Sequence, residues 1–177
     1  MSKYTITGIA IPYNSLALID NTVYEQIKPG AMNALLQANA NIKCCIQHNG
    51  NYILGSTADR TLILYDSPEG LRYSIALPNT TYANDLAEVM QKNPKTFGAS
   101  FHMRLQGNDY VMSRQGPRPL RTINNITAIY EITLTAFPAY TATTAVLNSA
   151  EPTGDGGERA KGLLQYWKIR ERAAAIV

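Results

Sequence analysis

The chain has little cysteine, histidine or tryptophan: two, two and one among its 177 residues. The two cysteines, Cys44 and Cys45, are adjacent, and neighbouring cysteines can close only a strained disulfide ring. A pair of this kind also cannot make a four-ligand zinc site. The sequence therefore excludes a disulfide-stapled fold, indicates reduced thiols in a cytosolic compartment, and implies neither a structural metal nor a cofactor.

Several sequence signals are also missing. The chain has no glycine-rich phosphate loop, no Walker sequence and no GxSxG elbow. Its start lacks the basic segment and apolar stretch of a secretory signal. The longest uncharged stretch, residues 132–150, contains several threonines, a proline and an asparagine, which are not typical of a membrane helix. We therefore expect the protein to stay where it is made and to have no membrane partner.

The composition indicates one globular domain with a short appendage. Hydrophobic residues make up 45% of the chain, which excludes a disordered protein. Basic and acidic residues balance over residues 1–157, so the net charge of +3 comes from the C-terminal end and a nucleic-acid-binding body is not expected. We predict a domain over 1–149, a linker over 150–157 and a basic amphipathic helix over 158–177.

Strand patterns dominate the predicted domain. Helices are expected at about 29–39 and 81–92, a turn at 49–51 and a loop at 107–119. Strands are expected at 4–11, 42–47, 61–65, 71–77, 97–105 and 120–135, the last with a bulge at 123–126. We predict a mainly β (α+β) fold with roughly seven short strands that form a closed or nearly closed antiparallel barrel flanked by helices.

Ser100 lies on the polar face of the strand predicted at 97–105. Phe97, Ala99 and Phe101 point to one face, whereas Ser100 and His102 point to the other. A hydroxyl on a rigid strand is well placed for a nucleophile, although a serine on a solvated strand face needs no function. A serine hydroxyl also needs a base, and the base needs a group that orients it.

Only His48 and His102 can supply an imidazole base, and Glu131 is a candidate to orient it. Glu131 lies among strongly β-forming apolar residues, where an unpaired carboxylate is costly to bury, so it needs a donor. A histidine or an arginine would serve equally well. A thiol protease built on Cys45 is disfavoured because residues 45 and 48 are expected on opposite strand faces.

A series of short segments, spread in order over about residues 5–145, resembles the caudovirus prohead serine protease family, which shares its fold with the herpesvirus assemblins. The matching segments are GIAIPYN (8–14), YEQIKPGAM (24–32), IQHN (46–49), LGST (54–57), TLIL (61–64), GLRY (70–73), LPNT (77–80), GASF (98–101) and YEITLTAFPAY (130–140).

The resemblance assigns the catalytic groups by position. It places the histidine at His48, the nucleophile at Ser100 and the carboxylate at Glu131. The family often has His-Asp and Ser-Phe-Gly-Phe, whereas this chain has His48-Asn49 and Ser100-Phe-His-Met103. His102 therefore shares the face of Ser100 and is a candidate to line the substrate groove or to act as base. By analogy with the assemblins, Arg121 and Arg118 are candidates for holding an oxyanion water.

The function implied by the resemblance is a serine endopeptidase of phage head maturation. Such an enzyme would act in the host cytoplasm, inside assembling proheads, on scaffold or capsid-protein extensions and on itself. The expected partners are the major capsid protein and the scaffold, and a second copy of the chain in a homodimer is a further candidate partner. No nucleic acid is expected to be required. Two alternatives remain open at this point: a catalytically inactive assembly module of the same fold, and an unrelated small-ligand-binding barrel in which His48 and Ser100 lie far apart.

Overall fold

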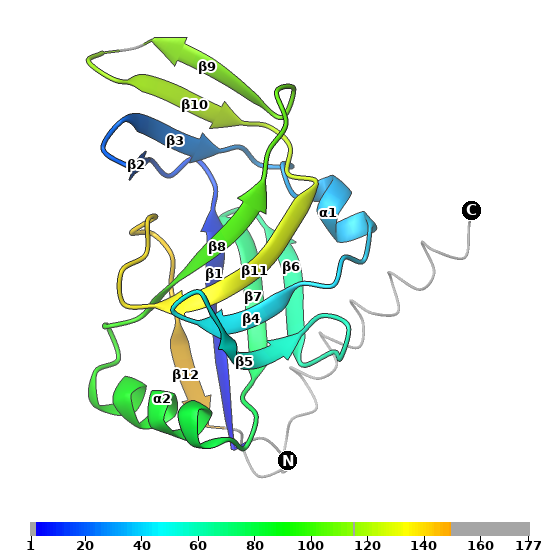
Figure 1. The fold of residues 1–177 in the computed structure, drawn as a ribbon, viewed down its shortest axis with the longest axis vertical. Coiled ribbons are helices and arrows are strands. Elements are labelled where there is room, and N and C mark those ends of the chain that lie inside the picture. The colour runs from blue at the N-terminus through cyan, green and yellow to red at the C-terminus, as the bar shows by residue number, and fades with distance from the viewer. Residues whose placement is uncertain (1–2, 115, 150–177) are drawn as a thin grey trace.

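The computed structural model describes residues 3–114 and 116–149, so the predicted linker (150–157) and helix (158–177) lie outside the described residues. The described part contains three four-stranded sheets and two helices (Figure 1). We call the sheets A, B and C. Sheet A has the order β12-β1-β7-β6, sheet B the order β2-β3-β10-β9 and sheet C the order β5-β4-β11-β8.

Sheet A is antiparallel throughout and supplies much of the core. Its strands are β1 (Tyr4–Pro12), β6 (Leu62–Ser67), β7 (Gly70–Ala76) and β12 (Val146–Ser149). Alternate residues of β7 are fully buried, among them Leu71, Tyr73 and Ile75. Apolar residues at every second position of a strand face one side of the sheet, so the predicted hairpin of β6 and β7 with one buried face is confirmed.

Sheet C carries the predicted site. Its strands are β4 (Lys43–Ile46), β5 (Asn49–Ser56), β8 (Gly98–Arg104) and β11 (Ala128–Thr135). Strand β11 lies between β8, to which it is antiparallel, and β4, to which it is parallel. The core side of this sheet includes Cys44, Ala99, Ile132 and Leu134, all fully buried. Sheets A and C contact each other through β1 and β8 and through β5 with β6 and β7.

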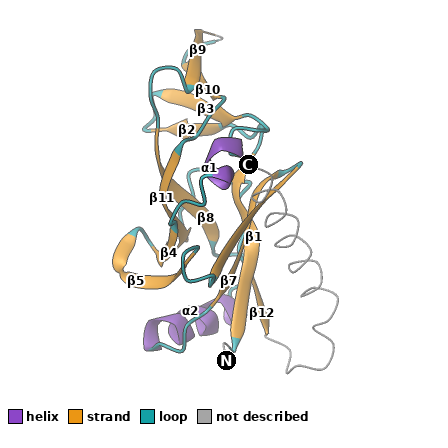
Figure 2. Ribbon diagram, turned by 90° about the vertical axis from the view of Figure 1, so that its right-hand side faces the viewer, coloured by secondary structure: helices purple, strands orange, loops and turns teal. Residues whose placement is uncertain are grey.

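Sheet B lies at one end of the molecule, and α2 lies at the other (Figures 1 and 2). Its strands are β2 (Ala17–Ile19), β3 (Val23–Ile27), β9 (Tyr110–Arg114) and β10 (Pro119–Ile123). Strands β2, β3, β9 and β12 were not predicted from the sequence, and all four are short and weakly patterned. Strand β5 of sheet C was not predicted either, although it is eight residues long.

The single strand predicted over 120–135 is wrong, because this segment forms β10 in sheet B and β11 in sheet C. Between them, the amides of Asn124 and Asn125 both donate to the Asp109 carbonyl, and the amide of Ile126 donates to the Ala31 carbonyl. These bonds fix residues 124–127 as a crossing between sheets. The bulge lies instead at Tyr130, where the register of β11 against β8 shifts.

The helices differ in how well the pattern predicted them. Helix α2 (Thr81–Lys92) has the predicted bounds, with Leu86 and Met90 buried. Helix α1 (Asn33–Gln37) is shorter than predicted, since Gly30 has a φ of 84° and Asn39 a φ of 47°. Positive φ is incompatible with a right-handed helix, so the flanking residues form turns instead.

The mainly β fold is confirmed, whereas a closed barrel is not established. No sheet among the described residues closes on itself, the described strands number twelve rather than about seven, and two strand pairs are parallel. Within residues 3–114 and 116–149, no helix is long and apolar enough to span a membrane.

Candidate active site

His48 lies in a two-residue turn between β4 and β5. Gln47 and His48 both have positive φ, 51° and 55°, as in the type I′ turns that join adjacent antiparallel strands. Such turns normally use asparagine and glycine, because a left-handed conformation costs other residues about 1–2 kcal/mol each. The turn predicted at 49–51 is wrong: Asn49 begins β5, and the next residues bulge from the β4–β5 pairing.

Four hydrogen bonds to β11 hold this unfavourable turn. The Gln47 amide donates to the Leu134 carbonyl at 3.0 Å, and its side-chain Oε1 accepts from Thr135 Oγ1 at 2.7 Å. The His48 amide donates to Thr133 Oγ1 at 2.9 Å, and His48 Nδ1 lies 2.7 Å from Glu131 Oε1. Both residues of the turn are therefore tied to β11 through main chain and side chain.

The Glu131 carboxylate has a partner on each of its oxygens. Oε1 meets His48 Nδ1, and Oε2 accepts from the Cys45 thiol at a sulfur–oxygen distance of 3.4 Å. With the carboxylate ionised, Nδ1 carries the proton, which leaves Nε2 of a neutral imidazole as an acceptor. This is the tautomer that a general base needs.

Cys45 shares the site with His48, contrary to the prediction that the two residues point to opposite faces. Strand β4 ends at Ile46, so the strict alternation of a strand does not extend to His48. Burial raises the pKa of the Cys45 thiol, the hydrogen bond with Thr133 lowers it by less, and the Glu131 carboxylate raises it further. The neutral thiol is thus the stable form, which suits a donor to Glu131 and not a nucleophile.

Ser100 lies on β8 directly opposite Thr133 of β11. Directly paired residues share a face of the sheet, with Cβ atoms roughly 4.5–5.5 Å apart. Because Thr133 Oγ1 also accepts from the His48 amide, Ser100 and His48 are both neighbours of Thr133. The structure thus brings the predicted alcohol, imidazole and carboxylate to the same face of sheet C.

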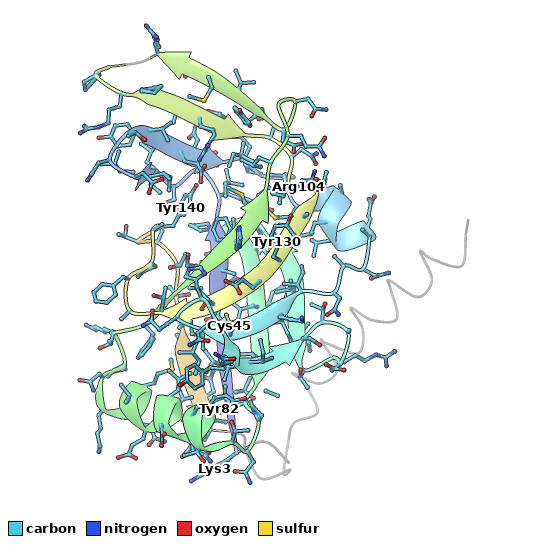
Figure 3. All side chains as sticks on the ribbon, viewed as in Figure 1. Lys3, Cys45, Tyr82, Arg104, Tyr130 and Tyr140 are labelled. Atoms are coloured by element: carbon cyan, nitrogen blue, oxygen red, sulfur yellow. The ribbon has the colours of Figure 1, made fainter. Side chains whose placement is uncertain are left out.

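His102 lies beside the carboxylate without replacing His48 as its partner. It is the register partner of Glu131 on β8 and is exposed, as the alternation predicted. Its ring packs edge-on against Tyr130, with centroids 5.1 Å apart. Figure 3 shows Tyr130 on β11 and Cys45 on the adjacent β4. The hydrogen bond to Glu131 favours His48 over His102 as the base.

The two predicted oxyanion arginines are committed to other partners in and beside sheet B. Arg121 Nε lies 2.6 Å from Glu25 Oε2, a carboxylate that is only 2% exposed, and Tyr140 donates to the other oxygen at 2.8 Å. Arg118 Nε donates to the Asn21 carbonyl at 3.0 Å. The geometry therefore gives neither guanidinium a contact with Ser100 that would support the predicted role.

Thr133 is a site residue that was not predicted from the sequence, whereas Cys45 was considered from the sequence only as a nucleophile and was disfavoured. Thr133 Oγ1 accepts from the His48 amide, donates to the Cys45 carbonyl at 3.2 Å and lies 3.5 Å from Cys45 Sγ. The sequence does contain a pattern that indicates Thr133. Glu131, Thr133 and Thr135 occupy alternate positions of β11, so one face of this strongly apolar strand is polar. No group of three or more His, Cys, Asp or Glu residues within the described ranges could hold a metal ion.

Herpesvirus proteases are among the solved structures with a similar fold. The Kaposi's sarcoma herpesvirus protease in complex with a hexapeptide phosphonate inhibitor has a TM-score of 0.56 and 13% identity, over 93% of this chain and 76% of that chain. The same protease with an allosteric inhibitor has a TM-score of 0.53 and 14% identity, over 93% and 91%. At such identities the likeness shows the fold alone.

The sequence comparisons identify the family. No curated protein matches the chain significantly. The sequence pattern that defines the caudovirus prohead serine proteases matches residues 1–155, most of the chain and all of the site described above. The chain therefore belongs to the caudovirus prohead serine protease family, and its role is that of a maturation protease acting in assembling capsids.

Proposed function

We propose that Ser100 is the nucleophile of this serine protease, His48 its general base and Glu131 the group that orients the base. The observation that carries the proposal is the hydrogen bond of 2.7 Å between His48 Nδ1 and Glu131, on the face where Ser100 lies opposite Thr133. In the reaction, His48 Nε2 accepts the Ser100 proton while Oγ attacks the peptide carbonyl carbon. The imidazolium then protonates the leaving amine, and water resolves the acyl-enzyme by the same steps.

The second part of the proposal concerns substrates. We propose that the enzyme cleaves extensions of the scaffold or major capsid protein inside the prohead, and its own chain. Family membership supports this assignment, since a prohead protease encounters these proteins within the shell. The segment from residue 150 onward contains the expected linker and is the candidate for self-cleavage.

The test is co-expression of the full chain with the capsid protein and scaffold of the same phage. Wild type should shorten these proteins, and Ser100→Ala should lower the cleavage rate by about 10⁴-fold or more. Ser113→Ala is a matched control, because Ser113 lies on β9 of sheet B. Unchanged processing by Ser100→Ala would remove Ser100 from the mechanism, and intact substrates with wild type would favour the inactive assembly module.

A further inference from the structure

Phe137 is the most exposed of the large hydrophobic side chains described. Its side chain is 88% exposed, compared with 60% for Val111, the next in order. Phe137 follows β11 within two residues, and β11 carries Glu131 and Thr133. A single exposed hydrophobic side chain needs no function by itself, so the position of the Phe137 ring relative to the site decides whether it can contact a ligand.

The loop that carries Phe137 is anchored to the turn that carries His48. The Phe137 amide donates to Thr135 Oγ1 at 3.1 Å. The same hydroxyl donates to the Gln47 side chain at 2.7 Å, one residue before His48. The position of the Phe137 main chain is thus set by the same side chain that braces the turn of the proposed base.

The loop is anchored to the strand of Ser100 as well. A Cβ at Gly98 would lie 2.7 Å from Thr143 Oγ1 and 2.9 Å from a ring carbon of Pro138, so only glycine permits this close approach of loop and strand. Thr143 Oγ1 also accepts from the Ala99 amide at 3.1 Å. Contacts on both sides of Phe137 therefore fix the loop, and the exposed ring does not arise from a loosely held segment.

Strand register places Phe137 relative to the scissile bond. Thr133 of β11 pairs with Ser100, and Thr135, the last residue of β11, pairs with Gly98. The end of β11 therefore lies two residues beyond the position that pairs with Ser100. An extended peptide advances about 3.3 Å per residue, as β11 does. A peptide that lies across Ser100 toward this end of sheet C reaches Phe137 about two to four residues from the bond that is cut.

We propose that Phe137 is a specificity residue that receives a large apolar side chain of the peptide substrate, about two to four residues from the scissile bond. The inference rests on the proposed function, because it takes Ser100 as the point of attack. It gives the substrate a chemical class: an extended segment with leucine, isoleucine, methionine or an aromatic residue at one fixed position. Contact between such a side chain and the Phe137 ring removes apolar surface of both from water, which favours binding.

The test separates peptide binding from cleavage. A tryptic digest of a bacterial lysate serves as the peptide library, and the full chain is used throughout. Binding is measured with immobilised Ser100→Ala, alone and combined with Phe137→Ala or with Val89→Ala, an exposed apolar control on α2. Cleavage is measured with wild type, Phe137→Ala and Val89→Ala, and new termini are read by mass spectrometry. Thermal unfolding checks that each variant is folded.

We expect Ser100→Ala to retain peptides rich in large apolar residues, the Phe137 double variant to retain roughly 10-fold fewer, and the Val89 double variant to retain the same amount. The cleavage sites of wild type should share an apolar position that Phe137→Ala no longer selects. Equal retention with and without Phe137, or no retention at all, would overturn the inference. The inference would also be overturned if Phe137→Ala changed only the sedimentation coefficient of the protein and left peptide binding and cleavage unchanged, since Phe137 would then contact another protein surface. Phe137-dependent binding without cleavage would instead refute the proposed peptidase and leave the binding site standing.

Discussion

Replacing Thr133 with valine should separate the geometry of the site from its chemistry. The change removes one hydroxyl and preserves the shape of the side chain. That hydroxyl accepts from the His48 amide at 2.9 Å and donates to the Cys45 carbonyl at 3.2 Å, although it takes no part in proton transfer from Ser100 to His48. A fall in activity would thus measure how far catalysis depends on the position of His48.

The magnitude follows from the strain in the turn. Two left-handed residues, Gln47 and His48, cost about 2–4 kcal/mol together. Four hydrogen bonds hold them, each worth about 1 kcal/mol net, so the turn is close to balance. Losing the Thr133 bond should let His48 move by about 1 Å, which costs roughly 100-fold in rate. The same change leaves the His48 amide and the Cys45 carbonyl without this partner, which should lower the free energy of unfolding by about 1–3 kcal/mol.

The assay is peptide hydrolysis at varied substrate concentration, together with urea unfolding. We expect kcat to fall and KM to stay within about threefold, because Thr133 positions the base and does not contact the substrate. Thr133→Ser retains the hydroxyl and should recover most of kcat. Wild-type kcat in Thr133→Val, or equal losses in both variants, would refute the argument that this hydroxyl positions His48.

Two further predictions concern Glu131 and Cys45. Glu131→Gln removes the charge that holds the Nδ1 proton of His48, so kcat should fall by about 10²–10⁴-fold, and the double variant with Ser100→Ala should be no slower than Ser100→Ala alone. Additive losses would instead separate the two residues. Because burial raises the pKa of the Cys45 thiol, its thiolate should be scarce at pH 8 and iodoacetamide should modify the folded chain about 10-fold more slowly than the unfolded chain, with a rate that rises with pH. Rapid modification at pH 7 with loss of activity would indicate a thiolate nucleophile.

Side-chain alternation predicted the part of the site that lies within regular strands. In β8, Ser100 and His102 face away from the buried Ala99, as the pattern requires. In β11, the apolar residues around Glu131 marked a strand whose carboxylate needed a donor. Both inferences rest on the two-residue period of a strand, which is local and can be read from one segment.

The parts that were not predicted depend on contacts between distant segments. The turn at Gln47 and His48 has an unfavourable sequence for its conformation and exists because β11 supplies four hydrogen bonds to it. Residues 124–127 leave the strand pattern because Asp109 and Ala31 accept their amide hydrogens. Such partners lie between 15 and 95 residues away, so the local sequence pattern does not show them.

Arg121 shows how a residue suited to one role can be held in another. Its guanidinium and the Tyr140 hydroxyl are the partners of Glu25, a fully enclosed carboxylate, and the Tyr140 ring stacks on Phe101 next to Ser100. Removing one partner of a buried ion pair leaves an uncompensated charge, which typically costs about 3–5 kcal/mol. An inactive Arg121 variant would therefore not identify an oxyanion donor, because loss of the Glu25 pair would disturb the packing behind Ser100 by itself. Only a variant that replaces Glu25 and Arg121 together with apolar residues can separate the two roles, since it removes the guanidinium without leaving a buried charge.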